Sequence, residues 1–397
     1  MEYKRLGDYI REVNVRNKDL KVTNLQGVSI SKLFIPSIAN TIGTDMSTYK
    51  VVNPGQFAYG PVTSRNGDKV SIALYKGDDD AIISQAYTVF EVVDKDKMSS
   101  DYLMMWFQRP EFDRYARFHS HGSAREIFDW DELCDTTIPV PSIERQREIV
   151  EEYETLSRRI RLNEQMIEKL EATAQALYRK MFVDGIDKEN LPEGWKMGAI
   201  EDILLKYVRG PFGSALKKED MQTCGVPVYE QQHVIDNHRD FRYYVSTEKY
   251  EQLKRFSVKE NDLVISCSGT IGRIIQIEKN DPIGIINQAL LILRVDSQKY
   301  SPTILRYFLL SDDGHEMLIE DARGSAQVNI AKREIIESIP IIIPNRNIIG
   351  ELDGKLQLID QSIKLRKQEN SKLSELQSLL LAKMGNIEQY DYGRRKE

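Results

Sequence analysis

The sequence predicts an α+β protein in which two mixed α/β domains, related by a pseudo-two-fold axis, are separated by an antiparallel coiled coil of two long helices. Two observations lead to this fold class. A heptad pattern of apolar residues occurs once in the middle of the chain and again near its C-terminus. Each pattern follows a segment of short β-prone runs punctuated by glycine and proline. The chain is therefore predicted to be an internal duplication of a domain followed by a helix.

The first long helix is expected over residues 141–183. Pro141 ends the preceding segment, and Ser142 can accept a hydrogen bond from the first turn of the helix. A helix of this length extends about 60 Å at 1.5 Å per residue. Apolar residues then recur four and three positions apart, which indicates a seam for one partner helix. The seam residues are Ile149, Leu156, Ile160, Asn163, Ile167, Leu170 and Leu177.

The second long helix is expected over residues 345–385, after Pro344, and repeats the same spacing. The two seams most simply pair with each other; the alternative is that each helix only edges a globular core. Polar seam members, among them Asn163, Arg366 and Asn370, weaken a generic zipper but can set register and partner choice. The second seam consists of Leu352, Leu356, Ile359, Ile363, Asn370, Leu373 and Leu380.

Each helix follows a globular segment of similar pattern. In the first domain, residues 1–140, β-prone runs at 51–60, 70–75 and 87–93 precede a helical pattern at 99–115, which suggests a mainly antiparallel sheet. A linker is expected at 184–196, the second domain at 197–344 and a polar tail at 386–397. Residues 258–266 occupy the place of residues 53–60 in the first domain, and residues 285–295 occupy the place of the strand expected at 87–93.

Composition narrows the class of protein. Hydrophobic residues make up 41% and charged residues 29% of the 397 residues, as in ordinary globular proteins. The net charge of −6 argues against nucleic-acid binding through bulk charge alone, so any DNA contact needs local basic surfaces. The charged N-terminus and the short apolar runs predict a cytoplasmic protein without membrane contact. Three scattered cysteines and five histidines lack zinc-ligand spacing, so no metal is expected.

The sequence lacks the common catalytic motifs. No phosphate-binding G-x-x-x-x-G-K-[ST], nucleophile elbow or H-E-x-x-H helix is present. Asn53-Pro54-Gly55-Gln56 lacks the second proline and the stacking aromatic of an adenine methyltransferase motif. We therefore expect no catalytic residue and no cofactor on this chain.

Polar and basic loops in both domains are the candidate DNA-binding sites. The segment from Arg109 to Arg125 interleaves basic residues with aromatics, and residues 209–218 form a basic glycine-rich loop. Arginine suits guanine or phosphate, and glutamine and asparagine suit adenine, although each residue singly could be an ordinary turn residue. The candidates are Ser64, Arg65, Asn66, Arg117, His119, His121, Ser123, Arg125, Arg209, Phe212, Ser214, Lys217, Gln231, Gln232, His233, Ser266, Ser268, Thr270, Arg323, Ser325, Gln327 and Asn329.

With these features, the chain resembles the specificity subunit of type I restriction-modification systems over nearly its whole length. The resemblance rests on the two heptad helices and on four segments: residues 138–149, Leu191 to Lys196, Arg209 to Lys217, and Ser268 to Gly272. Two features depart from it. The second helix lacks the Glu-Arg-Gln that opens the first, and Tyr3 stands where Trp195 stands in the second half.

The resemblance implies a non-catalytic subunit whose two target recognition domains each read half of a split DNA target. It implies that the helices set the gap between the halves and dock two methyltransferase subunits. The partners would carry the cofactors: S-adenosylmethionine on the methyltransferase, and ATP and Mg²⁺ on the restriction and translocase subunits. The alternatives are a stand-alone DNA methyltransferase or nuclease, and a coiled-coil adaptor without a DNA role.

Overall fold

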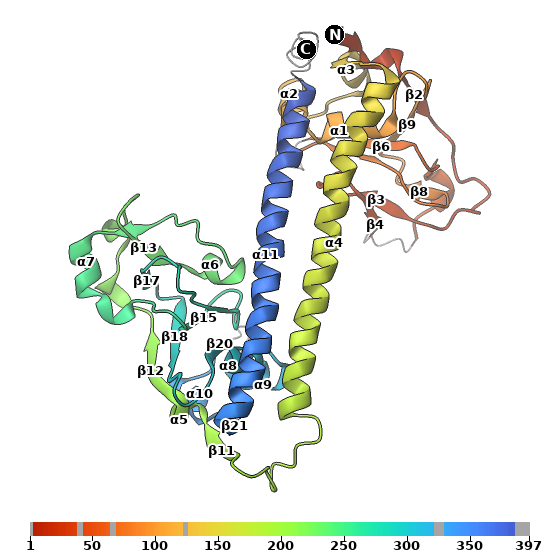
Figure 1. The fold of residues 1–397 in the computed structure, drawn as a ribbon. Helices are drawn as coiled ribbons and strands as arrows, with labels where there is room; N and C mark the ends of the chain where they lie inside the picture. The colour runs from red at the N-terminus through yellow and green to blue at the C-terminus, as the bar shows by residue number, and fades with distance from the viewer. Residues whose placement is uncertain (1–2, 38–42, 64–68, 122–125, 321–328, 386–397) are drawn as a thin grey trace, which may run out of the picture. The chain divides into compact units, whose positions relative to one another are not determined.

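A computed structural model describes residues 3–37, 43–63, 69–121, 126–320 and 329–385. The chain divides into two compact units. Unit 1 combines Met1–Asn163 with Gln368–Glu397, and unit 2 is Glu164–Lys367. Each unit contains one mixed α/β body, which we call head 1 (residues 3–139) and head 2 (residues 196–343), together with a segment of each of two long helices (Figure 1).

Head 1 is built on a four-stranded antiparallel sheet in the order β2-β9-β6-β7. Its strands are β2 (Ile10–Val13), β6 (Phe57–Gly60), β7 (Ser71–Leu74) and β9 (Thr88–Val92). The runs expected to be strands at 51–60, 70–75 and 87–93 therefore contain strands. The other elements are β1 (Tyr3–Arg5), η1 (Leu6–Asp8), β3 (Gln26–Val28), β4 (Phe34–Pro36), η2 (Met46–Thr48), β5 (Lys50–Val52), β8 (Ala81–Ile83), α1 (Ser100–Gln108), α2 (Pro110–Phe118), α3 (Trp130–Asp135) and β10 (Thr137–Pro139).

Head 2 repeats this topology, with a four-stranded sheet in the order β12-β18-β15-β16. Its strands are β12 (Leu204–Arg209), β15 (Leu263–Ser266), β16 (Ile274–Gln276) and β18 (Leu290–Val295). Strand β18 thus holds the place of β9, and β15 that of β6, as the duplication predicts. The other elements are β11 (Lys196–Ala199), α5 (Ile200–Ile203), η3 (Gly213–Ala215), η4 (Lys218–Asp220), β13 (Val226–Tyr229), α6 (Gln231–Ile235), β14 (Tyr244–Val245), α7 (Thr247–Gln252), η5 (Lys254–Phe256), β17 (Ile285–Ile286), α8 (Pro302–Leu309), α9 (Asp312–Leu318), β19 (Ile319–Glu320), β20 (Asn329–Ile330), α10 (Arg333–Ser338) and β21 (Pro340–Ile343).

The two heads differ in their smaller sheets. In head 1, β5 pairs antiparallel with β8. In head 2, β13 pairs antiparallel with β14 but parallel with β17. The expectation of mainly antiparallel sheets is met, with β13 and β17 as a parallel exception.

The core of head 1 lies between its sheet and helix α1, and it extends onto the long helices. Phe57 of β6 stacks on Phe90 of β9 with ring centroids 4.7 Å apart, and Phe107 of α1 meets Phe57 edge-on. Leu381 and Met384 of the second long helix belong to the same buried cluster. Because burial of apolar surface drives this packing, head 1 and its helix segments form one core.

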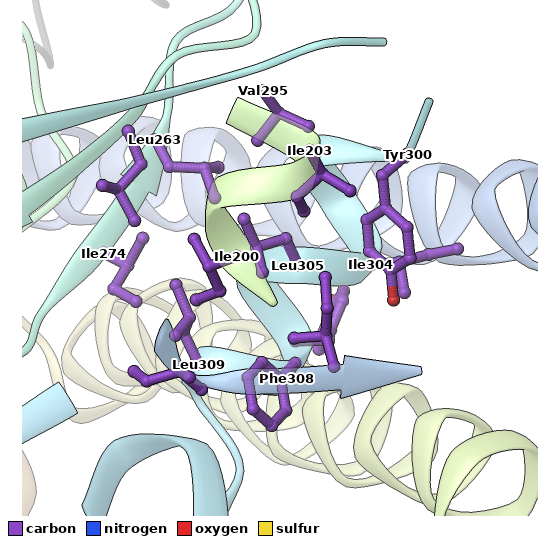
Figure 2. Packing of buried hydrophobic residues seen from close by; sticks show 14 of the residues in the cluster. Ile200, Ile203, Leu263, Ile274, Val295, Tyr300, Ile304, Leu305, Phe308 and Leu309 are labelled. Atoms are coloured by element: carbon purple, nitrogen blue, oxygen red, sulfur yellow. The ribbon is translucent and has the colours of Figure 1, made fainter. Parts of the chain in front are cut away.

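Head 2 has an equivalent core, shown in Figure 2. Ile200 and Ile203 of α5 pack with Leu263 of β15 and with Phe308 and Leu309 of α8. The same cluster takes in residues of both long helices, namely Ala174, Tyr178, Phe182, Leu352 and Leu356. Head 2 is therefore continuous with its own helix segments.

The long helices are α4 (Ile143–Phe182) and α11 (Arg346–Met384). Each begins at a polar cap: the backbone N–H of Arg145 donates to Ser142 Oγ over 3.3 Å, and that of Ile348 donates to Asn345 Oδ1 over 3.1 Å. The buried Gln146 fastens the start of α4 to head 1 by accepting from the backbone N–H of Ser99 and donating to the Lys97 carbonyl. Within each unit the two helices pack antiparallel.

The predicted seam residues lie on the buried or half-buried side of these helices in both units. In unit 1 these are Ile149, Leu156, Ile160, Asn163, Asn370, Leu373 and Leu380; in unit 2 they are Ile167, Leu170, Leu177, Leu352, Leu356, Ile359 and Ile363. The α+β class with two β-rich heads and two long helices packed together is thus confirmed. Among the described residues, none of the helices combines the length and apolar character needed to cross a bilayer.

Candidate nucleic-acid interface

In head 2, two candidate loops leave the sheet at the same edge. Strands β12 and β15 both pair antiparallel with β18, so they run in the same direction and end side by side around it. Arg209, at the end of β12, lies opposite Leu291, and Ser266, at the end of β15, lies opposite Leu290. We call this end of the sheet the loop edge of head 2.

The loop after β12 is held tightly against the sheet. The Gly210 N–H donates to the Leu290 carbonyl over 2.9 Å, and a Cβ at Gly210 would lie 1.9 Å from the Asn287 carbonyl oxygen. Only glycine allows this approach of two backbones. Pro211 is buried, whereas the next residue, Phe212, is 65% exposed. Lys217 is exposed as well, and the side chain of Ser214 is outside the described part of the chain.

Arg209 lies between this loop and the end of β15. Its guanidinium carbon is 5.8 Å from the centre of the Phe212 ring, a distance at which a cation–π contact stabilises both groups. Its Nη1 atom is buried without a hydrogen-bond partner in the described structure. Burial raises the pKa of the neighbouring Cys267 thiol to about 12, and Arg209 opposes this rise. Cys267 is therefore a neutral thiol at neutral pH.

The loop after β15 is pinned from two sides. Ser266 Oγ donates to the Thr270 carbonyl over 2.6 Å and accepts from the Arg273 N–H over 3.0 Å. Gln231 Nε2, at the start of α6, donates to the Ser268 carbonyl and, over 3.4 Å, to that of Thr270. Ser268 and Thr270 are exposed, so their hydroxyls are available to a ligand in a loop of fixed shape.

Two residues of this region are interior rather than exposed. Ser266 is fully buried, and His233 is 2% exposed. His233 Nδ1 accepts from the Glu230 N–H over 2.8 Å, which leaves its Nε2–H facing the Asp240 carbonyl at 3.1 Å. Both residues support the loops of this edge from the interior, so neither side chain lies on the surface that could contact DNA. The neighbouring Gln232 is exposed.

In head 1, an equivalent edge forms where β6 ends. Bridges from Val62 to Ile127 and from His121 to Ile127 bring the segment after α2 beside the end of β6. Thr63 Oγ1 and Ser120 Oγ are 2.9 Å apart in the same place. We call this the loop edge of head 1. The candidates Ser64, Arg65, Asn66, Ser123 and Arg125 belong to the adjoining segments, outside the described residues.

The described candidates of head 1 surround acidic side chains. His119 Nδ1 and His121 Nε2 each lie 3.7 Å from the Glu132 carboxylate, and Arg117 Nη2 lies 3.1 Å from Glu126. His121 is the more exposed histidine, with 73% of its side chain accessible. Arg117 and both histidines are thus gathered at one edge, and the ion pair with Glu126 orients Arg117.

One residue of the expected basic stretch, Arg109, is buried instead of exposed. It is 7% exposed, its guanidinium lies 4.2 Å above the Trp106 ring, and burial lowers its pKa. Arg109 is therefore part of the core of unit 1. Its place after Gln108, at the junction of α1 and α2, carries no sequence signal that separates it from the exposed arginines beyond it.

Sequence reasoning missed two contributors to head 2. The backbone of Gly210 packs against the Asn287 carbonyl. The His315 ring of α9 lies against Gly272, where an added Cβ would be 2.7 Å from the ring Nε2. Both contacts join distant parts of the chain, so no local pattern signals them. Arg323, Ser325 and Gln327 are outside the described residues, as is the side chain of Asn329. In the described part of the chain, no group of three or more His, Cys, Asp or Glu side chains could hold a metal ion.

Comparison with known proteins identifies the family. Residues 47–172 and 192–375 match the family described as Type I restriction modification DNA specificity domain. The HindI specificity subunit of Haemophilus influenzae is 21% identical, over 96% of this chain and 98% of that protein. The EcoBI specificity subunit of Escherichia coli is 22% identical, and the match covers 62% of this chain and 56%, a little over half, of that protein.

Solved structures share the fold. The S subunit of a type I restriction-modification system from M. genitalium aligns with a TM-score of 0.61 at 14% identity, over 96% of this chain and 95% of that one. A chain from a structure describing complex assembly and conformational transition of the type I R-M system aligns with a TM-score of 0.51 at 18% identity, over 96% and 97%. With the family match over most of its length, the chain belongs to the type I restriction-modification DNA specificity family, as a non-catalytic DNA specificity subunit with two target recognition domains.

Proposed function

We propose that each head reads one half of a split double-stranded DNA target with the loops at its loop edge. The observation that carries the proposal is the repeated topology: sheets of identical strand order end in polar, partly basic loops at the corresponding edge of both heads. In head 2 these loops present Arg209, Lys217, Ser268 and Thr270, whose groups suit phosphates and base edges. Rigid loops suit this task because a reading group must be held in register with the bases.

We further propose that α4 and α11 set the distance between the half-sites and dock two methyltransferase subunits. The seam and the caps give both helices a defined register in each unit. Helix α11 carries exposed leucines: Leu358 and Leu365, one heptad apart, are 65% and 58% exposed, and Leu376 and Leu379 are 48% and 50% exposed. Such rows on a charged helix are typical of surfaces that a partner helix covers.

The partner subunits would supply the cofactors. The methyltransferase would bring S-adenosylmethionine, and restriction and translocase subunits would bring ATP and Mg²⁺. Phosphate contacts made by these partners would also offset the net charge of −6. A cytoplasmic location, where chromosomal DNA is accessible, fits this assignment.

A head-exchange experiment tests the proposal. Residues 1–140 are replaced by the first recognition domain of another family member, and adenine methylation is mapped in cells that supply the methyltransferase. We expect one half of the methylated sequence to change and the other to stay. The matched control exchanges residues 197–344 and should change the opposite half. A change in both halves in either chimera would contradict independent heads.

A further inference from the structure

Each head exposes one phenylalanine at its loop edge. Of the twelve phenylalanines of the chain, ten are buried or half-buried, and two are strongly exposed: Phe118 at 82% and Phe212 at 65%. Single exposed apolar residues are common on protein surfaces. Here, however, the two fall one to a head, each at the edge where the candidate DNA-binding loops lie.

Phe212 is held outward by the geometry of its loop. The chain before it is fixed by the Gly210 N–H bond to the Leu290 carbonyl and by the burial of Pro211. After it, Gly213 has a φ of +62°, and a Cβ added there would have no described heavy atom within 4 Å. The Arg209 guanidinium lies 5.8 Å from the ring centre. The exposed Phe212 ring thus projects from a loop that lies close against the sheet, and the Arg209 guanidinium is beside it.

Phe118 is presented in a comparable way by a different element. It is the last residue of α2, and the bond from the His119 N–H to the Tyr115 carbonyl, 3.0 Å long, closes the helix directly after it. The His119 ring meets the Phe118 ring edge-on with centroids 5.2 Å apart. The bond of 2.7 Å from Ser120 Oγ to the Ala116 carbonyl fixes the turn that follows. Head 1 therefore also holds one aromatic ring out at its loop edge, next to Arg117.

The charged groups near the two phenylalanines indicate what kind of molecule these rings contact. In head 2, Arg209 lies beside the ring and Lys217 is exposed later in the same loop; in head 1, Arg117 directly precedes the ring and is paired with Glu126. Cations of this kind can neutralise phosphates. DNA-binding proteins that contact the minor groove frequently insert apolar side chains between base pairs, which partly unstacks the step and bends the duplex. Insertion would also bury apolar ring surface that the free protein leaves in water.

We propose that Phe118 and Phe212 act as wedges, each inserting partly between two stacked base pairs of the half-site that its head reads. This inference rests on the proposed reading of one half-site by each head. It adds a source of specificity that needs no hydrogen bond to a base. Pyrimidine–purine steps unstack most readily, so each half-site should contain a TA or CA/TG step where the ring enters.

Fluorescence of 2-aminopurine tests the wedge, because this base brightens when it loses its stacking neighbours. The full chain is assembled with its methyltransferase partner on duplexes that carry the probe in turn at each position of one half-site. With the wild type we expect brightening at one step in each half, apart from the methylated adenine itself, which a DNA methyltransferase flips out of the stack. Phe212→Ala should abolish the signal in the half read by head 2, weaken binding there about tenfold, and leave the other half unchanged. Phe118→Ala is the matched control and should show the reciprocal pattern.

The outcomes separate the wedge from its alternatives. Both rings are exposed, so neither substitution should change the melting temperature. If head exchange alters one half-site but the wild type brightens no probe other than the methylated adenine, or Phe212→Ala keeps the signal at the proposed step, the wedge is wrong while the reading of half-sites stands. If Phe212→Ala instead prevents assembly with the methyltransferase and leaves the signal of the assembled fraction unchanged, the ring is a protein contact and the proposal is overturned. If head exchange alters neither half, the function on which the wedge rests has failed.

Discussion

The side-chain amides of Asn163 and Asn370 meet across the helix pair of unit 1, where Asn163 Nδ2 donates to Asn370 Oδ1 over 2.8 Å. Asn163 also donates to Glu369 over 2.9 Å, and Glu369 accepts from Arg159 over 2.9 Å on the adjoining surface. Asn163 itself is 5% exposed. Because these groups pair only when the two residues stand opposite each other, the polar layer specifies one register of α4 against α11.

Removing one amide from this layer should destabilise the protein. In Asn163→Ala the half-buried Asn370 loses its donor, a change that costs about 1–3 kcal/mol. Replacing both asparagines by leucine should instead leave stability equal or higher, because it removes both polar groups and extends the apolar seam. Urea unfolding measures both effects. Glu164→Ala, at the exposed neighbouring position, is the control and should change stability by less than about 0.5 kcal/mol. An Asn163→Ala protein as stable as the wild type would show that the layer contributes nothing.

Lengthening the helices should lengthen the DNA target. Seven residues inserted after Asn163 and seven after Arg366 keep the heptad seam and add about 10.5 Å to each helix. At about 3.4 Å per base pair, the gap between half-sites should grow by about three base pairs, with both half-site sequences unchanged. Methylation mapping gives the result. The control inserts seven residues after Gly185, beyond the end of α4, and should leave the gap as it is. The same gap in both proteins would mean that the helices do not measure distance.

The loop after β15 depends on Gly269. Its φ is +63°, and an added Cβ would lie 2.8 Å from Gln231 Nε2, the group that pins this loop. Gly269→Ala should therefore displace Gln231 and the exposed Ser268 and Thr270, and reduce selectivity in the half-site of head 2 alone. Gly185→Ala is a matched control, because Gly185 has a φ of +75° but no heavy atom within 4 Å of the added Cβ. Competition binding with single-base variants of the target compares the two. Equal selectivity in both variants would exclude this loop from base recognition.

Much of the fold could be predicted from the sequence because its main signals are periodic. The heptad spacing puts Ile149 and Leu356 on the apolar face of their helices, and this does not depend on distant contacts. Strand-forming runs such as 87–93 are similarly local. The parallel pairing of β13 with β17 cannot be predicted from local patterns, because it joins segments more than fifty residues apart and β17 is only two residues long.

The candidate site was predictable only in outline. Glycine-rich and basic runs located the loops that leave β12 and β15, because such residues mark turns. Side-chain burial was not predictable, since it depends on distant partners. His233 is interior because it caps α6, and Arg109 because it lies on Trp106, yet both resemble surface residues in sequence. Phe212, a DNA-binding candidate from the sequence, is exposed, whereas nothing in the sequence distinguishes the exposed Phe118 from the buried Phe112 on the same helix.

Acid should weaken head 2 through His233. Burial lowers the pKa of this histidine, and His238 and Arg239 act in the same direction, while its hydrogen bond to Asp240 opposes them. The folded chain therefore holds the neutral ring, whose Nδ1 accepts from the Glu230 N–H, and the unfolded chain binds more protons between the folded pKa and about 6.5. The free energy of unfolding should fall as pH decreases from about 6.5 through that window, and α6 should release Gln231 from the loop. His233→Gln can still cap the helix but does not titrate, so its melting temperature should depend less on pH. His121→Gln removes an exposed histidine of head 1 and should keep the wild-type dependence. If His233→Gln loses stability in acid as steeply as the wild type, another group is responsible, because a glutamine at this position has no proton to gain.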